Sequence, residues 1–476
     1  MPTLISTRPL TNVRHAATAT CLLAIGLLTG CAVGPVYQLP DTPQPMAFKE
    51  AGPWLPAAPA DTLERGPWWT LFGDPLLNEL ASSVDVSNQN VAAAVASYAQ
   101  ARALVQQQRA ALFPALSLGA GVDRSGGPAA SAAASTPRYR LDIGASWEPD
   151  LWGRLRAGAS GAQASAQASA ADLAAARLSA QGELAINYFS ARQTDAQREL
   201  LAKTIEGYQR VLQITRNRFD AGVAARTDVL QAQTQLANAQ SDDLTLARQR
   251  AQLEHAIAVL LGKAPAQFAL AVAPWQANVP VVPVGVPSAL LQRRPDIAAA
   301  ERRVAAANAQ IGIARAAYYP NIGLSGTYGT GGSAVADLFS VSNAVWSLGL
   351  SAAQTVFNAG ATGASVSAAE AQQQVATARY RQSVLVAFAD VENQLAATGV
   401  LVQQQGLRRQ ASDAANLVEA QFLNRYKAGQ VGYTEVVQAQ VTALSARRAL
   451  VQVQADRQTS AVALIQSLGG GWHSEP

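Results

Sequence analysis

The chain has 476 residues, of which 49% are hydrophobic and only 14% are charged, and its formal net charge is +4. Its basic residues are interspersed with acidic ones, so we expect no nucleic-acid partner. The three histidines and two cysteines form neither a metal-ligand cluster nor a nucleophile–base pair. We therefore expect no enzymatic activity, no cofactor and no metal site.

Residues 1–30 are typical of an export signal. Arg8 and Arg14 precede an apolar run that is too short to span a membrane as a helix. The small residues before Cys31 resemble the lipobox of bacterial lipoproteins, in which the cysteine is acylated, for example with palmitate, and begins the mature chain. A plain signal peptide with an incidental cysteine is the alternative. Cleavage would remove Cys21 and leave a single cysteine, so no intramolecular disulfide is expected.

A proline-rich segment, residues 31–75, follows the signal. It contains nine prolines between Pro35 and Pro75, and proline neither continues a helix nor donates a ladder hydrogen bond. The simplest interpretation is an extended tether. Three tryptophans in the same segment favour docking against the rest of the protein instead: Trp54, Trp68 and Trp69.

The chain contains a tandem internal duplication. The sequence Arg-Phe-Asp-Ala-Gly at residues 218–222 is repeated as Arg-Tyr-Lys-Ala-Gly at residues 425–429, an offset of 207. The Thr-Asp-Val and Thr-Glu-Val triplets that follow keep the same offset. Each copy is much longer than a solenoid repeat, so it contains a whole set of structural elements. We place the copies at residues 76–262 and 283–469, with a tail at residues 470–476.

Long helices are predicted where proline is absent, from Asp150 to Ala264 and from Asn321 to Glu475. Alanine, glutamine, leucine and arginine favour helix there. A helix over about residues 155–219 would be ~100 Å long at ~1.5 Å per residue. Its apolar positions follow a heptad pattern: Leu201, Ile205, Tyr208, Leu212, Thr215 and Phe219. Gly222 and Gly429 supply the turns, so each copy contains a long helical hairpin.

Four strands are predicted at about residues 115–123, 138–147, 321–329 and 344–353, where apolar and polar residues alternate. Strands of this length with aromatic residues near their ends are typical of a membrane β-barrel with a wet lumen. Strands of a soluble sheet are the alternative. Four strands cannot close a barrel, and an open edge in lipid leaves backbone groups unpaired. Two, three or four copies of the chain would then share the barrel.

A second proline-rich stretch, residues 263–282, connects the two copies. Five prolines lie between Lys263 and Pro287. This composition favours an equatorial linker that runs around the helices rather than a further helix.

Three motifs carry a family resemblance. They are Trp-Trp at 68–69 with Phe-Gly-Asp-Pro at 72–75, the run from Trp147 to Arg154, and Leu-Leu-Gln-Arg-Arg-Pro-Asp-Ile at 290–297. With them, essentially the whole mature chain resembles the outer-membrane efflux factors of the TolC superfamily, in the lipoprotein branch that includes OprM and NodT-type proteins.

The resemblance implies a mixed α/β membrane protein. It implies a homotrimer with a twelve-stranded β-barrel, four strands per protomer, continued by a long α-helical periplasmic barrel. It also implies a periplasmic adaptor protein, an inner-membrane pump of the resistance-nodulation-division (RND) class and contact with outer-membrane lipids. The protein would be lipid-anchored at Cys31, extend into the periplasm and act as a passive channel in multidrug resistance.

The same resemblance places a periplasmic gate at the repeated turns. Four positions are carried over as gate candidates: Thr227, Asp228, Tyr426 and Glu435. Gln438 replaces a second acidic residue, and Val431 stands where some members have an intersubunit arginine. The alternative is that Asp228 and Glu435 only stabilise helix starts, where acidic residues are favourable.

The lipoprotein architecture and the NodT-like motifs favour export of small molecules such as drugs. A conduit for protein or peptide secretion with an ATP-driven transporter is the alternative. Metal-ion efflux is a subcase of the first interpretation, although the mature chain has a single methionine, Met46, and so no thioether ladder.

Overall fold

A computed structural model describes residues 32–42, 45–51, 67–124, 137–280, 282 and 293–470. The export signal, Cys31, Trp54 and most of the tail lie outside the described residues. The chain divides into two compact units. The first contains residues 1–40, 99–168 and 300–380, and the second contains residues 41–98, 169–299 and 381–476.

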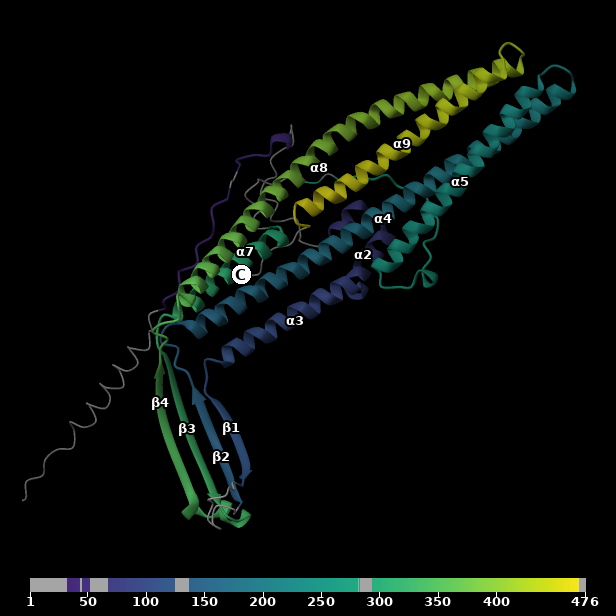
Figure 1. The fold of residues 1–476 in the computed structure, drawn as a ribbon. Coiled ribbons are helices and arrows are strands. Elements are labelled where there is room, and N and C mark those ends of the chain that lie inside the picture. The colour runs from purple at the N-terminus through teal and green to yellow at the C-terminus, as the bar shows by residue number, and fades with distance from the viewer. Residues whose placement is uncertain are drawn as a thin grey trace, which may run out of the picture. The chain divides into compact units, whose positions relative to one another are not determined.

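The duplication is visible in the lengths of the elements (Figure 1). In the first copy they are α2 (Pro75–Ser87), α3 (Gln89–Ala110), β1 (Ala115–Asp123), β2 (Arg138–Trp147), α4 (Arg154–Asp220) and α5 (Arg226–Leu260). In the second they are α7 (Pro295–Ala316), β3 (Asn321–Gly332), β4 (Ala344–Ala353), α8 (Ala361–Lys427) and α9 (Tyr433–Ser467). Helices α4 and α8 both have 67 residues, and α5 and α9 both have 35.

The four strands form one antiparallel sheet in the order β1-β2-β3-β4, so β1 and β4 are its edges. Ile143 pairs with Leu118 and with Tyr328, and Tyr328 pairs with Trp346. This register places the large apolar residues of the four strands on one face, except Val345, which pairs with Gly329 on the other face. The large side chains on it are solvent-exposed in a single chain: Leu116, Leu118, Val122, Ile143, Tyr328, Trp346, Leu348 and Leu350.

The opposite face of the sheet is made mainly of glycine and serine. Gly119, Gly121, Gly144, Gly329 and Gly331 lie on it by register. The alternation predicted from the sequence is thus maintained across all three strand pairs. A sheet with one exposed apolar face and two open edges is incomplete as a single chain.

The motif from Trp147 to Arg154 fixes the passage from β2 into α4, within the first unit. Asp150 accepts hydrogen bonds from the backbone N–H groups of Leu155 and Arg156 at 3.0 and 2.8 Å, as an acidic group at a helix start does. The Trp152 indole donates to the Pro320 carbonyl at 2.7 Å, where β3 begins. The motif therefore links the two copies where helix meets strand.

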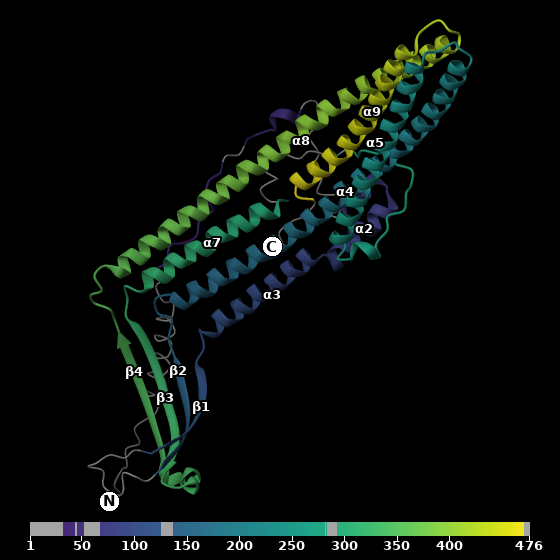
Figure 2. The same ribbon diagram turned by 45° about the vertical axis from the view of Figure 1, so that its right-hand side comes forward.

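In the second unit, the hairpins α4–α5 and α8–α9 run side by side with their turns at the same end (Figures 1 and 2). Their core contains Leu201, Tyr208, Ala239 and Leu246, all less than 10% exposed. Leu201 and Tyr208 are heptad positions predicted from the sequence. The heptad prediction was wrong for Phe219, which is 42% exposed at the end of α4.

The proline-rich N-terminal segment packs against helices in both units. In the first unit Gly34 contacts Gly312 of α7, where a Cβ on Gly34 would lie 2.9 Å from the Gly312 Cα. In the second unit the backbone N–H groups of Lys49 and Glu50 donate to the Glu392 carboxylate at 2.7 and 2.9 Å. Trp68 and Trp69 are buried in the 3-10 helix η3 (Trp68–Phe72). The segment is docked, as these two tryptophans predicted.

Candidate functional site at the helical turns

Two tight turns end the long helices of the second unit. Gly222 and Gly429 have φ values of 72° and 74°, in the left-handed region that favours glycine. The N–H of Val223 donates to the Arg218 carbonyl at 2.8 Å, and the N–H of Gln430 donates to the equivalent Arg425 carbonyl at 2.9 Å. These bonds satisfy carbonyl groups that a helix end leaves free, so each helix stops at its Ala-Gly pair.

The four gate candidates lie at this end of the second unit, but in different environments. Asp228 is half-buried in the first turn of α5, whereas Thr227 and Glu435 are exposed. Glu435 folds back over the start of α9, where a Cβ on Gly432 would lie 3.0 Å from its Oε2 atom. Tyr426 is 2% exposed, so its ring belongs to the interior of the protomer.

Tyr426 packs in a cluster that both hairpins build. Its ring lies 5.4 Å from that of Tyr433, at an angle of 53°. Buried residues of α4, α5 and α9 complete this cluster: Val211, Leu212, Ala232 and Val436. The Tyr426 hydroxyl is 3.5 Å from the Thr215 Oγ1, which in turn donates to the Val211 carbonyl. The cluster connects the first copy to the second through side chains.

The negative charge of Asp228 acts on Tyr433. Burial is the main reason that the pKa of the Tyr433 hydroxyl lies above its ordinary value, and Tyr426, Tyr208 and the negative charge of Asp228 add to that increase. A tyrosinate beside a carboxylate is disfavoured in this interior, so Tyr433 stays neutral. Val229, the residue after Asp228 in α5, packs against the same cluster.

Sequence reasoning did not identify Arg218 and Tyr433 as residues of this region, and it placed Thr215 only in the heptad pattern of the long helix, where Thr215 is fully buried. Arg218 and Tyr426 are joined across the hairpins, and Arg218 also lines a shallow hollow of about 470 Å³ with Ile214 and Lys427. A difference between the two copies could have pointed to Tyr433. At the equivalent position the first copy has Arg226, which is exposed.

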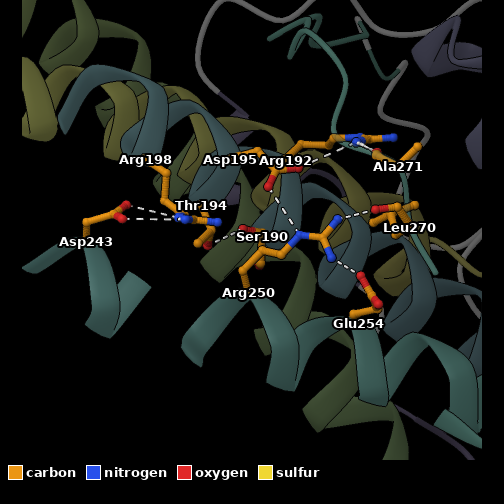
Figure 3. A network of polar contacts seen from close by, with 10 residues as sticks. All are labelled: Ser190, Arg192, Thr194, Asp195, Arg198, Asp243, Arg250, Glu254, Leu270 and Ala271. Atoms are coloured by element: carbon orange, nitrogen blue, oxygen red, sulfur yellow. Dashed lines mark hydrogen bonds and ion pairs between the residues drawn. The ribbon is translucent and has the colours of Figure 1, made fainter. Parts of the chain in front are cut away.

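A second polar region holds the linker between the copies against the helices of the second unit (Figure 3). Arg192 of α4 donates to the Ala271 carbonyl at 2.7 Å, and Arg250 of α5 donates to the Leu270 carbonyl. Asp195 lies between the two arginines, 3.2 Å from Arg250 Nε and 3.6 Å from Arg192 Nη1. Arg192 and Asp195 are each 3% exposed, so these charges are neutralised inside the protein.

The same chain of contacts reaches the N-terminal helix α2. Arg192 lies over the Tyr188 ring at 4.9 Å, and the Tyr188 hydroxyl donates to Asp74 at 2.6 Å. Burial, followed by this hydrogen bond, raises the pKa of Tyr188 to about 12. Asp74 also accepts from the N–H groups of Leu76 and Leu77 at the start of α2. The Phe-Gly-Asp-Pro motif is thus a helix cap that is tied to α4.

Comparisons with known proteins agree with this architecture. The family described as outer membrane efflux protein matches the chain twice, at residues 80–263 and 286–470. The toluene efflux pump outer membrane protein TtgC of Pseudomonas putida is 31% identical over 457 residues, covering 94% of each chain. The pyoverdine export outer membrane protein OpmQ of Pseudomonas aeruginosa is 31% identical over 450 residues, covering 91% of this chain and 94% of that protein.

A solved structure has the same fold. The outer-membrane channel OprN superposes with a TM-score of 0.84 at 30% sequence identity, covering 93% of this chain and 100% of that one. The double family match agrees with the two copies that the helix lengths show. The chain belongs to the outer membrane efflux protein family.

Proposed function

We propose that three copies of this chain assemble into one channel, with a twelve-stranded barrel in the outer membrane and a helical barrel in the periplasm. The observation that carries this proposal is the four-stranded sheet with an exposed apolar face and with β1 and β4 as open edges. Pairing of β4 with β1 of the next protomer removes both edges. The apolar face then contacts lipid, and the glycine- and serine-rich face lines the lumen.

The chain is an outer-membrane efflux channel and not an enzyme. It conducts passively. For its cargo we propose small organic molecules, which the names of the relatives support: one is a toluene efflux protein and the other exports pyoverdine. A periplasmic adaptor protein and an RND-class inner-membrane pump are the partners that we propose, and the pump would supply the driving force.

The mature N-terminus would attach the protein to the outer membrane through an acylated Cys31. Docking of the following segment supports this placement. The Val33 N–H donates to the Trp152 carbonyl at 3.3 Å, close to the junction of β2 and α4. A lipid on Cys31 would therefore enter the membrane near the end of the sheet.

The periplasmic gate is proposed at the turns of α4–α5 and α8–α9, with Thr227, Asp228, Tyr426 and Glu435 as its residues. Helix ends have fewer neighbours than helix centres and open at lower free-energy cost. In the trimer each polar contact at the gate would occur three times, so its small contributions would sum to a larger free energy of closure. The packing of Val229, next to Asp228, against the cluster of Tyr426 and Tyr433 supports this placement.

The trimer and its transport function can be tested together. Detergent-extracted protein is expected to run as a heat-sensitive trimer on mild gels. It should also restore resistance to a strain that keeps its adaptor and pump but lacks this channel. A protein that is folded in the membrane yet monomeric would contradict the shared barrel. A trimer that never restores resistance with any adaptor and pump would contradict the small-molecule assignment.

A further inference from the structure

The charged residues of the four strands gather in one place. The strands contain four of them, and all four lie on the polar face of the sheet: Asp123, Arg138, Arg140 and Asp142. They occupy the half of the sheet nearest the β1–β2 loop, away from the helices. Asp123 and Arg138 are register partners at the end of the ladder, where their opposite charges offset each other. Arg140 and Asp142 lie further inside.

Arg140 and Asp142 form an ion pair in which the partners are unequally exposed. The Arg140 Nε lies 3.4 Å from the Asp142 Oδ1. The Arg140 side chain is 64% exposed and that of Asp142 is 33% exposed. A solute moving along this face therefore meets the guanidinium first. The Asp142 carboxylate contacts the guanidinium from the side and holds it in place.

Glycines flank both residues on the neighbouring strands. Arg140 pairs with Gly121 and Gly331, and Asp142 pairs with Gly119 and Gly329. A Cβ on Gly119 would lie 3.0 Å from an Asp142 carboxylate oxygen, and a Cβ on Gly329 would lie 2.8 Å from the Asp142 Cβ. A side chain at position 119 would displace the carboxylate, and one at position 329 would press on the Leu141 carbonyl and the Asp142 Cβ, so the recessed position of Asp142 requires these glycines.

The glycines also leave Arg140 accessible. Gly121 and Gly331 put no side chain beside the guanidinium, and an added Cβ on Gly121 would remain 3.8 Å from its Nη2 atom. The strand neighbours of the pair are therefore bare backbone, beside one projecting cation and one recessed anion, and the nearest apolar side chain in this row is Val345, beyond Gly329. A planar guanidinium can accept a carboxylate or another oxyanion in two-point contact.

We propose that Arg140 and Asp142 form a charge-selecting ring in the outer half of the channel lumen, which transiently binds oxyanion groups of exported solutes. This inference rests on the proposed trimer, in which three Arg140 guanidinium groups face one lumen. Arg140 attracts anionic groups, and Asp142 positions it and limits the local positive potential. The ring acts over about one Debye length, ~8 Å at physiological salt, so it affects solutes that pass close to it.

A reporter thiol deeper on the same face would measure this potential. Ser325 lies on the polar face opposite Ser146, four register pairs further toward the helices than Asp142. Intact cells carrying Ser325→Cys would be treated from outside with membrane-impermeant methanethiosulfonates, one anionic and one cationic. The ratio of their reaction rates reports the sign of the potential that they cross.

Arg140→Gln should lower the ratio of the anionic to the cationic rate about fourfold, the size expected for three screened charges acting on reagents of opposite sign. Asp142→Asn should raise the ratio by a similar factor. The double variant should return close to the parent ratio. Arg315→Gln removes the same charge from α7, outside the sheet, and should leave the ratio unchanged.

The outcomes separate this inference from the trimer proposal. A Ser325→Cys thiol that reacts with neither reagent would overturn the lumenal placement of this face and the ring with it. A reactive thiol whose rate ratio does not change in Arg140→Gln or Asp142→Asn would overturn the ring alone. Mild gels verify that each variant forms trimers. If Arg140→Gln fails to do so, the ring is tested by Asp142→Asn, whose ratio of anionic to cationic reaction rates should rise.

Discussion

Arg218 of α4 donates a hydrogen bond to the main-chain carbonyl of Tyr426 in α8 at 2.8 Å, and its guanidinium lies 4.7 Å from the centre of the Tyr426 ring. One side chain thus satisfies a carbonyl at the end of the second long helix and covers the aromatic residue beside it. The contact joins the two hairpins at their turns. Its counterpart in the second copy, Arg425, lies over Phe422 of its own helix instead, at 5.9 Å.

Replacing Arg218 should loosen the turns. Arg218→Ala removes a charge-assisted hydrogen bond and a cation–π contact, together ~2 kcal/mol of local stability. We expect roughly 30-fold faster hydrogen exchange of backbone amides in both turns. Arg425→Ala is the matched control, since Arg425 is exposed and contacts its own helix. Equal exchange rates in the two variants would contradict a tie between the hairpins.

The proposed gate predicts a larger effect from a double substitution than from either single one. Asp228→Ala removes a negative charge that acts on Tyr433, and Tyr426→Phe removes the hydroxyl that lies 3.5 Å from the Thr215 Oγ1. A single polar contact contributes only ~1 kcal/mol, so one change should have a small effect. Together they should raise single-channel conductance in planar bilayers and increase the sensitivity of cells to vancomycin, with the trimer intact.

Asp220→Ala serves as the control for the gate, because it removes an exposed carboxylate from the end of α4. A double variant that assembles normally and keeps both conductance and vancomycin sensitivity unchanged would show that closure lies elsewhere. Asp228 and Tyr426 would then be ordinary groups of helix ends.

The attachment of the linker to the helices should depend on the largely buried charges of Arg192, Asp195 and Arg250. Arg250→Met leaves Asp195 buried with one partner fewer and removes the contact to the Leu270 carbonyl, which we expect to cost ~3 kcal/mol. Unfolding in guanidinium chloride and limited proteolysis at residues 268–280 would measure this. Arg198→Met breaks a more exposed pair with Asp243 and should cost at most ~1 kcal/mol. Similar losses in both variants would contradict a special role for the buried network.

The proposed acylation of Cys31 predicts that the mature N-terminus is modified. Mass spectrometry of the purified protein should find an acylated cysteine as the first residue. Cys31→Ser should abolish the modification while trimers still form, since the strands and helices hold the protomers together. An unmodified N-terminus at another residue would refute the lipid anchor.

The regular elements of this protein follow from local sequence. Period-two alternation identified all four strands, because a sheet with one apolar and one polar face requires it. The proline-free stretches identified α4 and α8, and the Ala-Gly pairs at 221–222 and 428–429 identified their ends. The constant offset of about 207 residues revealed the duplication. These features depend only on neighbouring residues along the chain.

The environments of equivalent residues were decided by tertiary structure. Phe219 and Tyr426 occupy the same place in the two copies, yet Phe219 is 42% exposed and Tyr426 is 2% exposed. Asp228 is half-buried and its counterpart Glu435 is exposed. Two copies of one sequence pattern pack against each other with different faces, so each residue acquires its own neighbours. Burial of Tyr426 depends on residues of the other copy, more than 200 positions away in the chain, and no local pattern in the sequence records that contact.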